Sequence, residues 1–530
     1  MNNQLKLKKY LGFLDLVMVG LGGIIGSGWL LGAQAAAKIS GPAAIFAWII
    51  GAFAVILIGL VYAELGARMP ESGGIVKYPD YSHGSLTSYL MGFAALIAYS
   101  TVPPVEAQAV VNYAAGYFPK GMLFQISGLP TFTGWLIEVM FLVLFFFLNY
   151  FGVNLFAKVN TTVTFLKFVV PTATIILLLF SLHGANFTSH HFAPFGFKGV
   201  FSAIATSGVV FAFLGFRQIS ALAGEARNPQ KHIGPAIVIS IVLAAVLYTL
   251  LQVGFIGGVS PKTLSAGWGA LNFSAPYVEL LSVLGFGWFA VFLYADALIS
   301  PSGTGNVYFA STSRVTMALS ENQYWWRRFG HVDEKTGVPR PALWFSLVLA
   351  ILWTAPFPTW SALVGFISGA TVLTYIIGPV SAMVFRRTAQ DFSSPFRVKY
   401  LPVVSALAFI IGTLIIYWTG WSNVWPLIVM EMVGLLIYAG FVLKRPELKK
   451  NIVKDLKSGV WLVVYLIFIL VMSYIGSFGG HKWIAYPWDN VVVAAGSLIF
   501  FIWGVASGYP TNSLFSAKSL HQSSSHAVDA

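Results

Sequence analysis

Long apolar runs alternate along this chain with short polar connections. The runs recur from Phe13 almost to Pro510, and many are about 20 residues long, the length a helix needs to cross ~30 Å of hydrocarbon. The pattern predicts an all-α polytopic membrane protein with about fourteen transmembrane helices. The predicted spans are residues 13–38, 42–67, 86–117, 133–152, 157–182, 200–223, 233–257, 277–301, 342–356, 360–385, 402–420, 424–443, 459–475 and 489–508.

The composition excludes a soluble protein. Hydrophobic residues make up 57% of the chain and charged residues only 9%, whereas soluble domains carry roughly 25% charged residues. The first apolar run has no small-residue cleavage site after it, so we expect it to be retained as a span. The chain contains no cysteine, which rules out disulfides and thiolate metal sites. We expect no cofactor and no bound metal.

The positive charge follows the membrane topology. A net charge of +13 could indicate a nucleic-acid partner, but its distribution argues against one. With the N-terminus inside, Lys167 and Arg217 lie within spans and all but five of the other basic residues fall on the cytoplasmic side. This asymmetry predicts a protein of the inner or plasma membrane with both termini in the cytoplasm. The five basic residues of the outside loops are Lys38, Lys120, Lys198, Lys262 and Lys482.

Four polar stretches are predicted to lie in the cytoplasm. Residues 68–85 resemble a turn-rich connector, and residues 320–340, which include two tryptophans followed by two arginines, suit a helix at the membrane surface. Residues 444–457 form a basic linker before the last two spans. The Ser- and His-rich residues after Pro510 are expected to be disordered.

Two spans are expected to be interrupted. Residues 20–29 of span 1 contain five glycines, each costing about 1 kcal/mol relative to alanine in a helix. The alternative is a packing seam, because Gly22 and Gly26 form a GxxxG pair. Residues 207–217 of span 6 combine two glycines with a charge at membrane depth. The two spans are five helices apart, so the second unit is inverted, and interrupted helices at matching positions of inverted halves indicate a transport site.

These segments resemble the amino acid–polyamine–organocation (APC) superfamily of permeases. The resemblance rests on GlyGlyIleIleGlySerGlyTrp at 22–29, GluLeuGlyAlaArgMetProGluSerGlyGly at 64–74, and the stretch from PheLeuGlyPhe to IleGlyProAla at 213–236. Residues 73–84, 300–306 and 474–479 resemble the branch of bacterial aspartate–proton symporters.

The resemblance implies a leucine-transporter-like fold of five-plus-five inverted repeats. Residues 1–199 would form the first repeat (spans 1–5) and residues 200–400 the second (spans 6–10). Residues 401–510 would add spans 11–14, and residues 511–530 would be a disordered cytoplasmic tail.

The resemblance also implies a substrate site at the two breaks. Backbone amides of Gly26, Ser27 and Gly28 would bind the α-carboxylate of an amino acid at the positive end of a helix. Carbonyls of the span 6 break, here those of Phe211, Ala212 and Phe213, would take its ammonium group. The remaining residues of this predicted site are Gly23, Ile25, Gly215 and Arg217.

Lys167 is a candidate for coupling. It lies nine residues beyond Lys158, at the predicted cytoplasmic end of span 5, and is therefore ~13 Å deeper at ~1.5 Å per residue. In proton-coupled relatives a lysine here replaces a sodium ion, so we expect it to contact the Gly23 carbonyl and Ser300 or Ser302. The alternative is a permanent structural ion pair.

Three further charges lie at membrane depth, where ionisable groups are costly and usually functional. Arg217 offers a planar fork that fits a second carboxylate on the substrate; alternatively, it pairs with Glu106 or Asp296. Either of these two acids could carry the proton. Asp15, Glu64, Glu225 and Glu279 lie near span ends and suit caps or gate pairs, and Glu431 suits helix packing.

The function predicted is proton-coupled symport of an acidic amino acid, aspartate before glutamate. An exchanger, or a symporter of neutral amino acids, is the main alternative within this fold. A membrane enzyme is disfavoured because the chain has no HExxH motif and no paired acids at membrane depth. A channel would favour a shared symmetric pore without inverted, interrupted helices.

Overall fold

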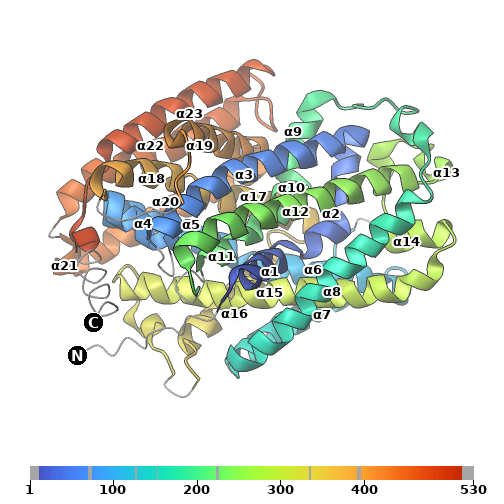
Figure 1. The fold of residues 1–530 in the computed structure, drawn as a ribbon, viewed down its shortest axis with the longest axis horizontal. Helices are drawn as coiled ribbons and strands as arrows, with labels where there is room; N and C mark the ends of the chain where they lie inside the picture. The colour runs from blue at the N-terminus through green and yellow to red at the C-terminus, as the bar shows by residue number, and fades with distance from the viewer. Residues whose placement is uncertain are drawn as a thin grey trace.

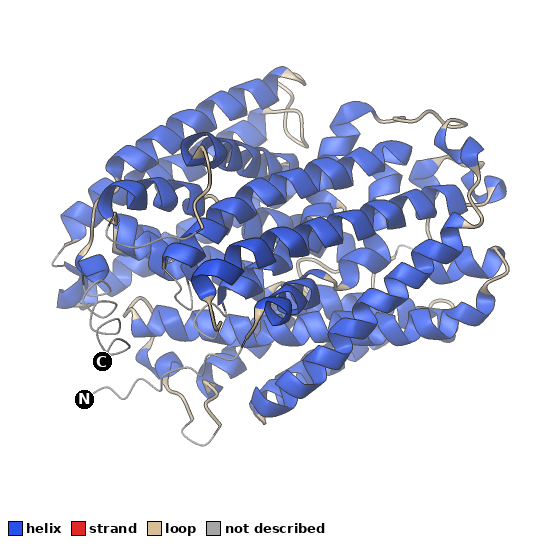
Figure 2. Ribbon diagram, viewed as in Figure 1, coloured by secondary structure: helices blue, strands red, loops and turns tan. Residues whose placement is uncertain are grey.

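The fold is helical throughout. The computed structural model describes residues 11–69, 74–125, 128–151, 153–221, 226–333, 336–390, 396–449 and 451–515. Within these residues the extended structure is limited to two isolated bridges (Figure 2). Most long helices run along one axis, horizontal in Figure 1, with α4 and α21 at one end and α13 and α14 at the other.

The helices fall into three groups along the chain. The first group is α1 (Phe13–Ile24), α2 (Ser27–Ser40), α3 (Ala44–Arg68), α4 (Gly74–His83), α5 (Ser85–Ser100), α6 (Val102–Ala114), α7 (Phe132–Tyr150) and α8 (Val153–Leu179). The second is α9 (Gly196–Thr206), α10 (Val209–Phe213), α11 (Arg217–Ala221), α12 (Pro229–Gly258), α13 (Pro261–Leu264), α14 (Pro276–Val283), α15 (Ala290–Glu321), α16 (Arg340–Trp353), α17 (Trp360–Tyr375) and α18 (Ile377–Thr388). The third, which we call the appended spans, is α19 (Leu401–Trp418), α20 (Trp421–Lys444), α21 (Pro446–Lys449), α22 (Ile452–Ile475) and α23 (Trp488–Ser507).

Nine helices of the described residues are long and apolar enough to cross a membrane, or ten if one bent pair is counted as a span. Their outward surface is apolar as well. On α7, Leu136, Met140 and Leu144 are all exposed and stand four residues apart on one helix face. Such a row suits contact with lipid. The chain is therefore an all-helical, multi-pass membrane protein, while the predicted number of fourteen spans stays a prediction.

Both expected interruptions are present. In span 1, Ile25 and Gly26 separate α1 from α2. In span 6, Gly208 adopts φ +89°, a left-handed conformation that glycine tolerates best, and α9 is bent by 45° from the helix that follows it. A 3₁₀ turn at Leu214–Phe216 then separates α10 from α11. Span 6 is thus interrupted at two points.

The prediction for span 8 was wrong in its bounds. Residues 277–301 are split between α14 and α15 by a short 3₁₀ helix at Gly287–Phe289. Helix α15 continues to Glu321, and the described residues between it and α16 do not form the predicted surface helix. They turn instead, with a 3₁₀ helix at Arg327–Gly330 and a buried Trp325.

Three predicted loops are also more ordered than expected. Residues 68–85 contain α4, and residues 444–457 contain α21 and the start of α22. The predicted disordered tail begins with residues that pack, since Thr511 donates its backbone amide to the Tyr81 carbonyl at 3.4 Å. Residues 516–530 lie outside the described residues.

The appended spans contact α9 of the second group. Phe201 of α9 stacks on Trp418 of α19 with ring centroids 4.5 Å apart. The ammonium of Lys198 donates to the Ser477 carbonyl at 2.7 Å and lies 5.4 Å from the centre of the Phe478 ring. These contacts fasten the beginning of α9 to the loop between α22 and α23.

Candidate functional site

The break in span 1 frees backbone groups in the protein interior. Ile25 and Gly26 are outside both helices, and residues 20–33 are buried. The Ile25 carbonyl accepts hydrogen bonds from the hydroxyls of Ser300 and Thr304, each at 3.3 Å. Since no water reaches such groups inside a bilayer, the freed amides and carbonyls must bind each other, a side chain or a ligand.

A carboxylate already occupies the amide end of this break. Glu106 Oε2 accepts a hydrogen bond from the Ser27 amide at 2.8 Å, and Ser27 is the first residue of α2. The negative charge thus lies at the positive end of a helix, which favours it. Its Oε1 is buried without a hydrogen-bond partner in the described residues. The Ser27 amide is one of the three we predicted for the substrate carboxylate, so the side chain holds the place of the ligand.

Lys167 lies at the same break, on α8. Its ammonium donates to the Gly22 carbonyl and to Thr304 Oγ1, each at 3.0 Å. We predicted a contact with the Gly23 carbonyl, but the lysine contacts the carbonyl of the preceding residue, Gly22. On α15 it contacts Thr304 instead of the predicted Ser300 or Ser302. Ser302 Oγ is buried and has no hydrogen-bond partner in the described residues. Glu106 and Asp296 both act electrostatically on the lysine, and the lysine side chain is 1% exposed.

Asp296 ties span 8 to α2, the second half of span 1. Its Oδ2 accepts a hydrogen bond from Trp29 Nε1 of α2 at 3.1 Å, while its Oδ1 has no partner in the described residues. The ring of Trp29 also stacks on Tyr277, 5.5 Å away. Asp296 and Glu106 therefore reach α2 at two points two residues apart.

Span 6 lies against the break in span 1. A side-chain carbon at Gly215 would overlap backbone atoms of Gly23 and Ile24, and one at Gly28 would lie 2.8 Å from Ala212 Cβ. Phe211, Ala212 and Phe213 are buried. We predicted that carbonyls of these three residues would bind the ammonium, but they belong to helix α10, and the interruptions lie on either side of it.

Two tyrosines fasten the carbonyls around this contact. The Tyr248 hydroxyl donates to the Ile24 carbonyl at 3.0 Å and approaches the Ala212 carbonyl at 3.4 Å. The Tyr375 hydroxyl donates to the Leu214 carbonyl at 3.1 Å. Both breaks are therefore held by side chains of other spans.

Arg217 begins α11 directly after the 3₁₀ turn. Its Nη1 donates to Thr374 Oγ1 at 2.7 Å, and its guanidinium lies 5.2 Å from the centre of the Tyr99 ring and 4.6 Å from that of Tyr375. Its Nη2 is buried and meets no acceptor with hydrogen-bond geometry in the described residues, although the Tyr375 hydroxyl lies beside the guanidinium.

The side chains around the Arg217 guanidinium are aromatic. Within the described residues, its electrostatic neighbours are tyrosines, and the salt bridges there involve other residues. The alternative that it pairs with Glu106 or Asp296 is not what the structure has. A buried cation held by π faces and by the hydroxyls of Thr374 and Tyr375 keeps further N–H donors for an incoming acceptor.

The amino-acid sequence is similar to known proteins along nearly the whole chain. The family model for amino acid permeases matches residues 11–442. The chain is an amino acid permease of that family. An aspartate-proton symporter of Bacillus subtilis is 42% identical over 513 residues, which cover 96% of this chain and 98% of the relative. A glutamate/serine transporter of the same organism is 43% identical over 525 residues, 97% of each chain. A branched-chain amino acid permease is 27% identical over 84% of this chain and 95% of its own.

The permease therefore transports an amino acid and is not an enzyme. Within the described residues, no group of three or more His, Asp or Glu side chains could hold a metal ion.

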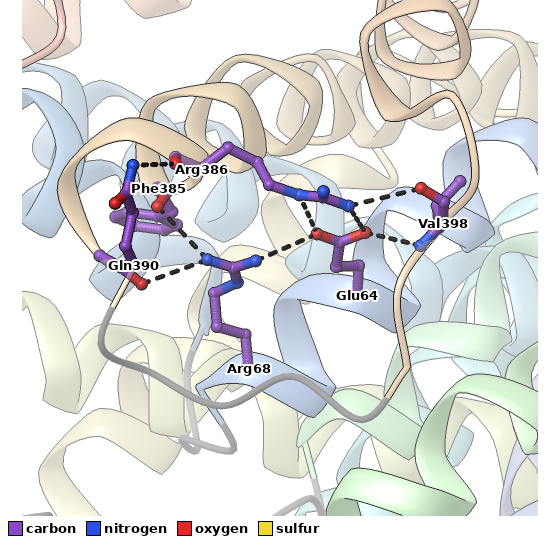
Figure 3. A network of polar contacts seen from close by, with 7 residues as sticks. Glu64, Arg68, Phe385, Arg386, Gln390 and Val398 are labelled. Carbon is purple, nitrogen blue, oxygen red and sulfur yellow. Dashed lines mark hydrogen bonds and ion pairs between the residues drawn. The ribbon is translucent and has the colours of Figure 1, made fainter.

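Glu64 of the permease belongs to a network at the end of α3 (Figure 3). The guanidinium of Arg386 binds both of its carboxylate oxygens, at 2.7 and 2.8 Å, and Arg68 binds one of them at 3.4 Å. Arg68 also donates to the carbonyls of Phe385 and Ala389 at 3.3 and 3.2 Å. This arrangement joins α3 to α18 through ion pairs, and a role in gating stays a prediction.

The remaining carboxylates are mostly structural. Asp15 accepts the Gly12 amide at 2.8 Å at the start of α1, and Glu279 accepts the amides of Ser274 and Ala275 at the start of α14. Both are helix caps, as predicted. Glu225 lies outside the described residues. Glu431 is buried on α20, and neither carboxylate oxygen has a hydrogen-bond partner in the described residues.

Sequence reasoning missed several residues of the site. Thr304 joins Lys167 to the Ile25 carbonyl, and Trp360 of α17 donates to Ser27 Oγ at 3.0 Å. Tyr248 and Tyr375 hold the carbonyls. Hydroxyl and indole groups cost little free energy in an apolar span compared with a charge. Such residues are therefore common in spans, and their type alone does not indicate a site. Thr304 had a signal, because it lies within residues 300–306, one of the motifs of the resemblance.

Proposed function

We propose that this permease couples the entry of an acidic amino acid, aspartate before glutamate, to the entry of a proton. The observation that carries the proposal is Arg217, a buried cation with an unused donor and without a carboxylate partner in the described residues. Arg217 lies two residues after Gly215, and Gly215 packs directly against the break in span 1. A substrate bound at that break would place a side-chain carboxylate within its reach.

The α-carboxylate and the proton would compete for one place. As a carboxylate, Glu106 accepts the Ser27 amide; as a neutral acid it is a much weaker acceptor. Protonation would release the amides of Gly26, Ser27 and Gly28 to the substrate, and carbonyls of residues 211–213 would take the ammonium. Proton and amino acid would then bind together. Asp296 is the second candidate for the proton, since it also borders Lys167 and α2.

Lys167 would replace a sodium ion. Its ammonium joins the end of α1 to α15 through the Gly22 carbonyl and Thr304, and a fixed cation there leaves no place for a second one.

The proposed architecture is the leucine-transporter-like fold with alternating access around the broken spans. Residues 1–199 and 200–400 would be inverted repeats, residues 401–510 would add spans 11–14, and residues 511–530 would be a cytoplasmic tail. Both termini would lie in the cytoplasm, in the cell membrane. The contact between the two breaks supports this arrangement, because it pairs equivalent positions of the two repeats.

The main alternative is a broader or neutral substrate. It is supported by the glutamate/serine transporter, which is as similar to this chain as the aspartate-proton symporter. An exchanger of the same fold would carry out counterflow without any response to a pH gradient.

Uptake of labelled aspartate into proteoliposomes is expected to depend on an imposed pH gradient and to ignore sodium, because Lys167 supplies the charge that sodium supplies elsewhere. The measurement compares uptake with and without the gradient, in sodium and in choline buffers. Uptake that needs sodium at constant pH would contradict the proposal, and counterflow indifferent to the gradient would favour the exchanger.

Arg217→Gln is expected to weaken aspartate binding about tenfold to a hundredfold, since a charge-assisted hydrogen bond contributes roughly 1.5–3 kcal/mol. Alanine binding should change far less, because a neutral amino acid uses backbone groups alone. Binding of both amino acids is measured by calorimetry or scintillation proximity. Arg327→Gln is the matched control, because Arg327 is exposed.

Two results would sink the acidic-substrate proposal. One is tighter binding of alanine than of aspartate by the wild type. The other is an equal loss for both amino acids in Arg217→Gln, which would make the arginine a structural residue.

A further inference from the structure

The segment after α23, residues 508–515, folds back onto α4. The amides of Tyr509 and Thr511 donate to the carbonyls of Ser82 and Tyr81 at 2.9 and 3.4 Å. Arg387 of α18 donates to the Gly508 carbonyl at 2.7 Å. The segment therefore ties α4 to α18 and to the appended spans, at the end of the molecule where α4 lies in Figure 1.

A charged carboxylate anchors this junction. Asp455 of α22 accepts hydrogen bonds from the amide and hydroxyl of Ser85 and from the Tyr509 hydroxyl. Ser85 is the first residue of the sixteen-residue helix α5, so Asp455 caps that helix from another element. Three donors and a helix N-terminus therefore converge on its two carboxylate oxygens.

A second carboxylate, Asp80 of α4, lies beside it. The two line a cavity of about 160 Å³ together with Tyr324, Tyr509 and Ser513. Among the described residues, Asp80 accepts from fewer donors than Asp455, namely the Tyr324 hydroxyl at 3.4 Å and the Ser513 side chain.

The surroundings of Asp80 favour its neutral form. Burial, together with the Asp455 charge, raises the pKa of Asp80 to about 6. Among the described residues, three tyrosines of neighbouring elements also interact with it electrostatically: Tyr324, Tyr438 and Tyr509. On α4 itself, burial lowers the pKa of His83 to about 4, so His83 stays neutral where Asp80 titrates.

We propose that residues 508–515 form a latch that holds α4 when the cytoplasm is acidic and releases it as the cytoplasm becomes alkaline, so that acidification slows the permease. The proposal goes beyond the function proposed above and uses only its assignment of α4 to the cytoplasmic side. A carrier that brings protons in would thereby limit its own acidification of the cell.

The direction follows from proton linkage. The latched form, with a raised Asp80 pKa, binds a proton that a solvated Asp80 would release. The stabilisation of the latched form by this proton is therefore full at pH values below 3.8, the ordinary pKa of an aspartate. It is lost as the pH rises through about 6. Above that, two neighbouring carboxylates repel each other across the cavity.

The link to transport is the position of α4. It joins α3 to α5, and Ser82 of α4 lies 2.9 Å from the Ser381 hydroxyl of α18. The Glu64–Arg386 pair of Figure 3 joins α3 to the same helix. An opening that separates α3 and α4 from α18 would have to break these contacts, so a tighter latch would slow that opening.

Hydrogen exchange in the full-length protein tests the latch without depending on the substrate. After correction for intrinsic exchange, protection of residues 508–515 is expected to fall about tenfold between pH 5 and pH 7.5, from the pKa difference. Asp80→Asn imitates the neutral acid, so its protection should stay high at both pH values. Tyr509→Phe should lower protection at both and keep the pH dependence, and Tyr400→Phe, at an exposed tyrosine, should match the wild type.

Uptake of labelled aspartate, with the pH varied on the α4 side, tests the consequence. Acidification should slow the wild type but not Asp80→Asn, which should be slow throughout. The latch is overturned if hydrogen-exchange protection of residues 508–515 in the wild type does not depend on pH. It is also overturned if Asp80→Asn keeps the pH dependence of the wild type. If Asp80→Asn does not fold, the wild type and Tyr509→Phe decide the matter by the same exchange measurement. Absence of uptake at every pH would count against the proposed function, and the exchange data would still decide the latch.

Discussion

Lys167→Ala is expected to abolish transport while expression stays near that of the wild type. The ammonium donates to both the Gly22 carbonyl and Thr304 and so joins them. It is also a cation that acts electrostatically on both Glu106 and Asp296. Without it, the end of α1 loses its tether to α15, and two buried carboxylates lose their counter-charge, which costs several kcal/mol at membrane depth. Proteoliposome uptake under a pH gradient measures the loss.

The matched control is Lys262→Ala, which removes an exposed lysine and should leave uptake unchanged. Thr304→Val offers a milder step, because it removes one acceptor and keeps the charge, so uptake should fall only in part. A Lys167→Ala protein that transports at the wild-type rate would make the lysine a structural residue and remove the basis for proton coupling.

Gly215→Ala is expected to abolish substrate binding more completely than it lowers thermal stability. A single added carbon would overlap the carbonyl group of Gly23 and the amide of Ile24, which are backbone atoms and cannot turn aside. The two breaks would have to separate, and the groups that bind the substrate would separate with them. Binding assays and thermal unfolding of the purified protein measure both effects.

Gly26→Val should act in the same way for a different reason, since the new side chain would meet Glu106 Oε1 at 2.8 Å and Thr304 Oγ1 at 2.9 Å. Gly440→Val is the control, because nothing lies within 4 Å of a side-chain carbon there. Binding that survives in Gly215→Ala would show that the glycines serve packing and that the site lies elsewhere.

The positions of the breaks could be predicted because their signals are local. Five glycines within residues 20–29 weaken one helix enough to place its interruption within a few residues. Gly208 marks the bend in span 6 in the same way. Lys167 was found because a charge in an apolar run is costly wherever the run folds.

The partners of these residues could not be predicted, because they are set by how helices pack. Lys167 contacts Gly22 instead of Gly23, a difference that depends on where α1 unwinds. Glu106 binds the Ser27 amide across 79 positions of sequence, and no periodicity indicates such a pairing. The bounds of α15 were missed because residues 302–321 are polar for a span, and their burial against other helices, not lipid, permits this.

The fastening of α9 through Lys198 and Phe201 makes the two parts of span 6 mechanically unequal. The first part, α9, is anchored, and the second part, Val209–Ser220, follows the bend at Gly208. Its twelve residues, which include the 3₁₀ turn at Leu214–Phe216, span ~18 Å at ~1.5 Å each. A swing of about 10° about the bend would then move its far end by ~3 Å, roughly the width of a water molecule, from the same geometry. A small rotation at one glycine is therefore enough to open or close a gap the size of a water molecule at the far end of span 6.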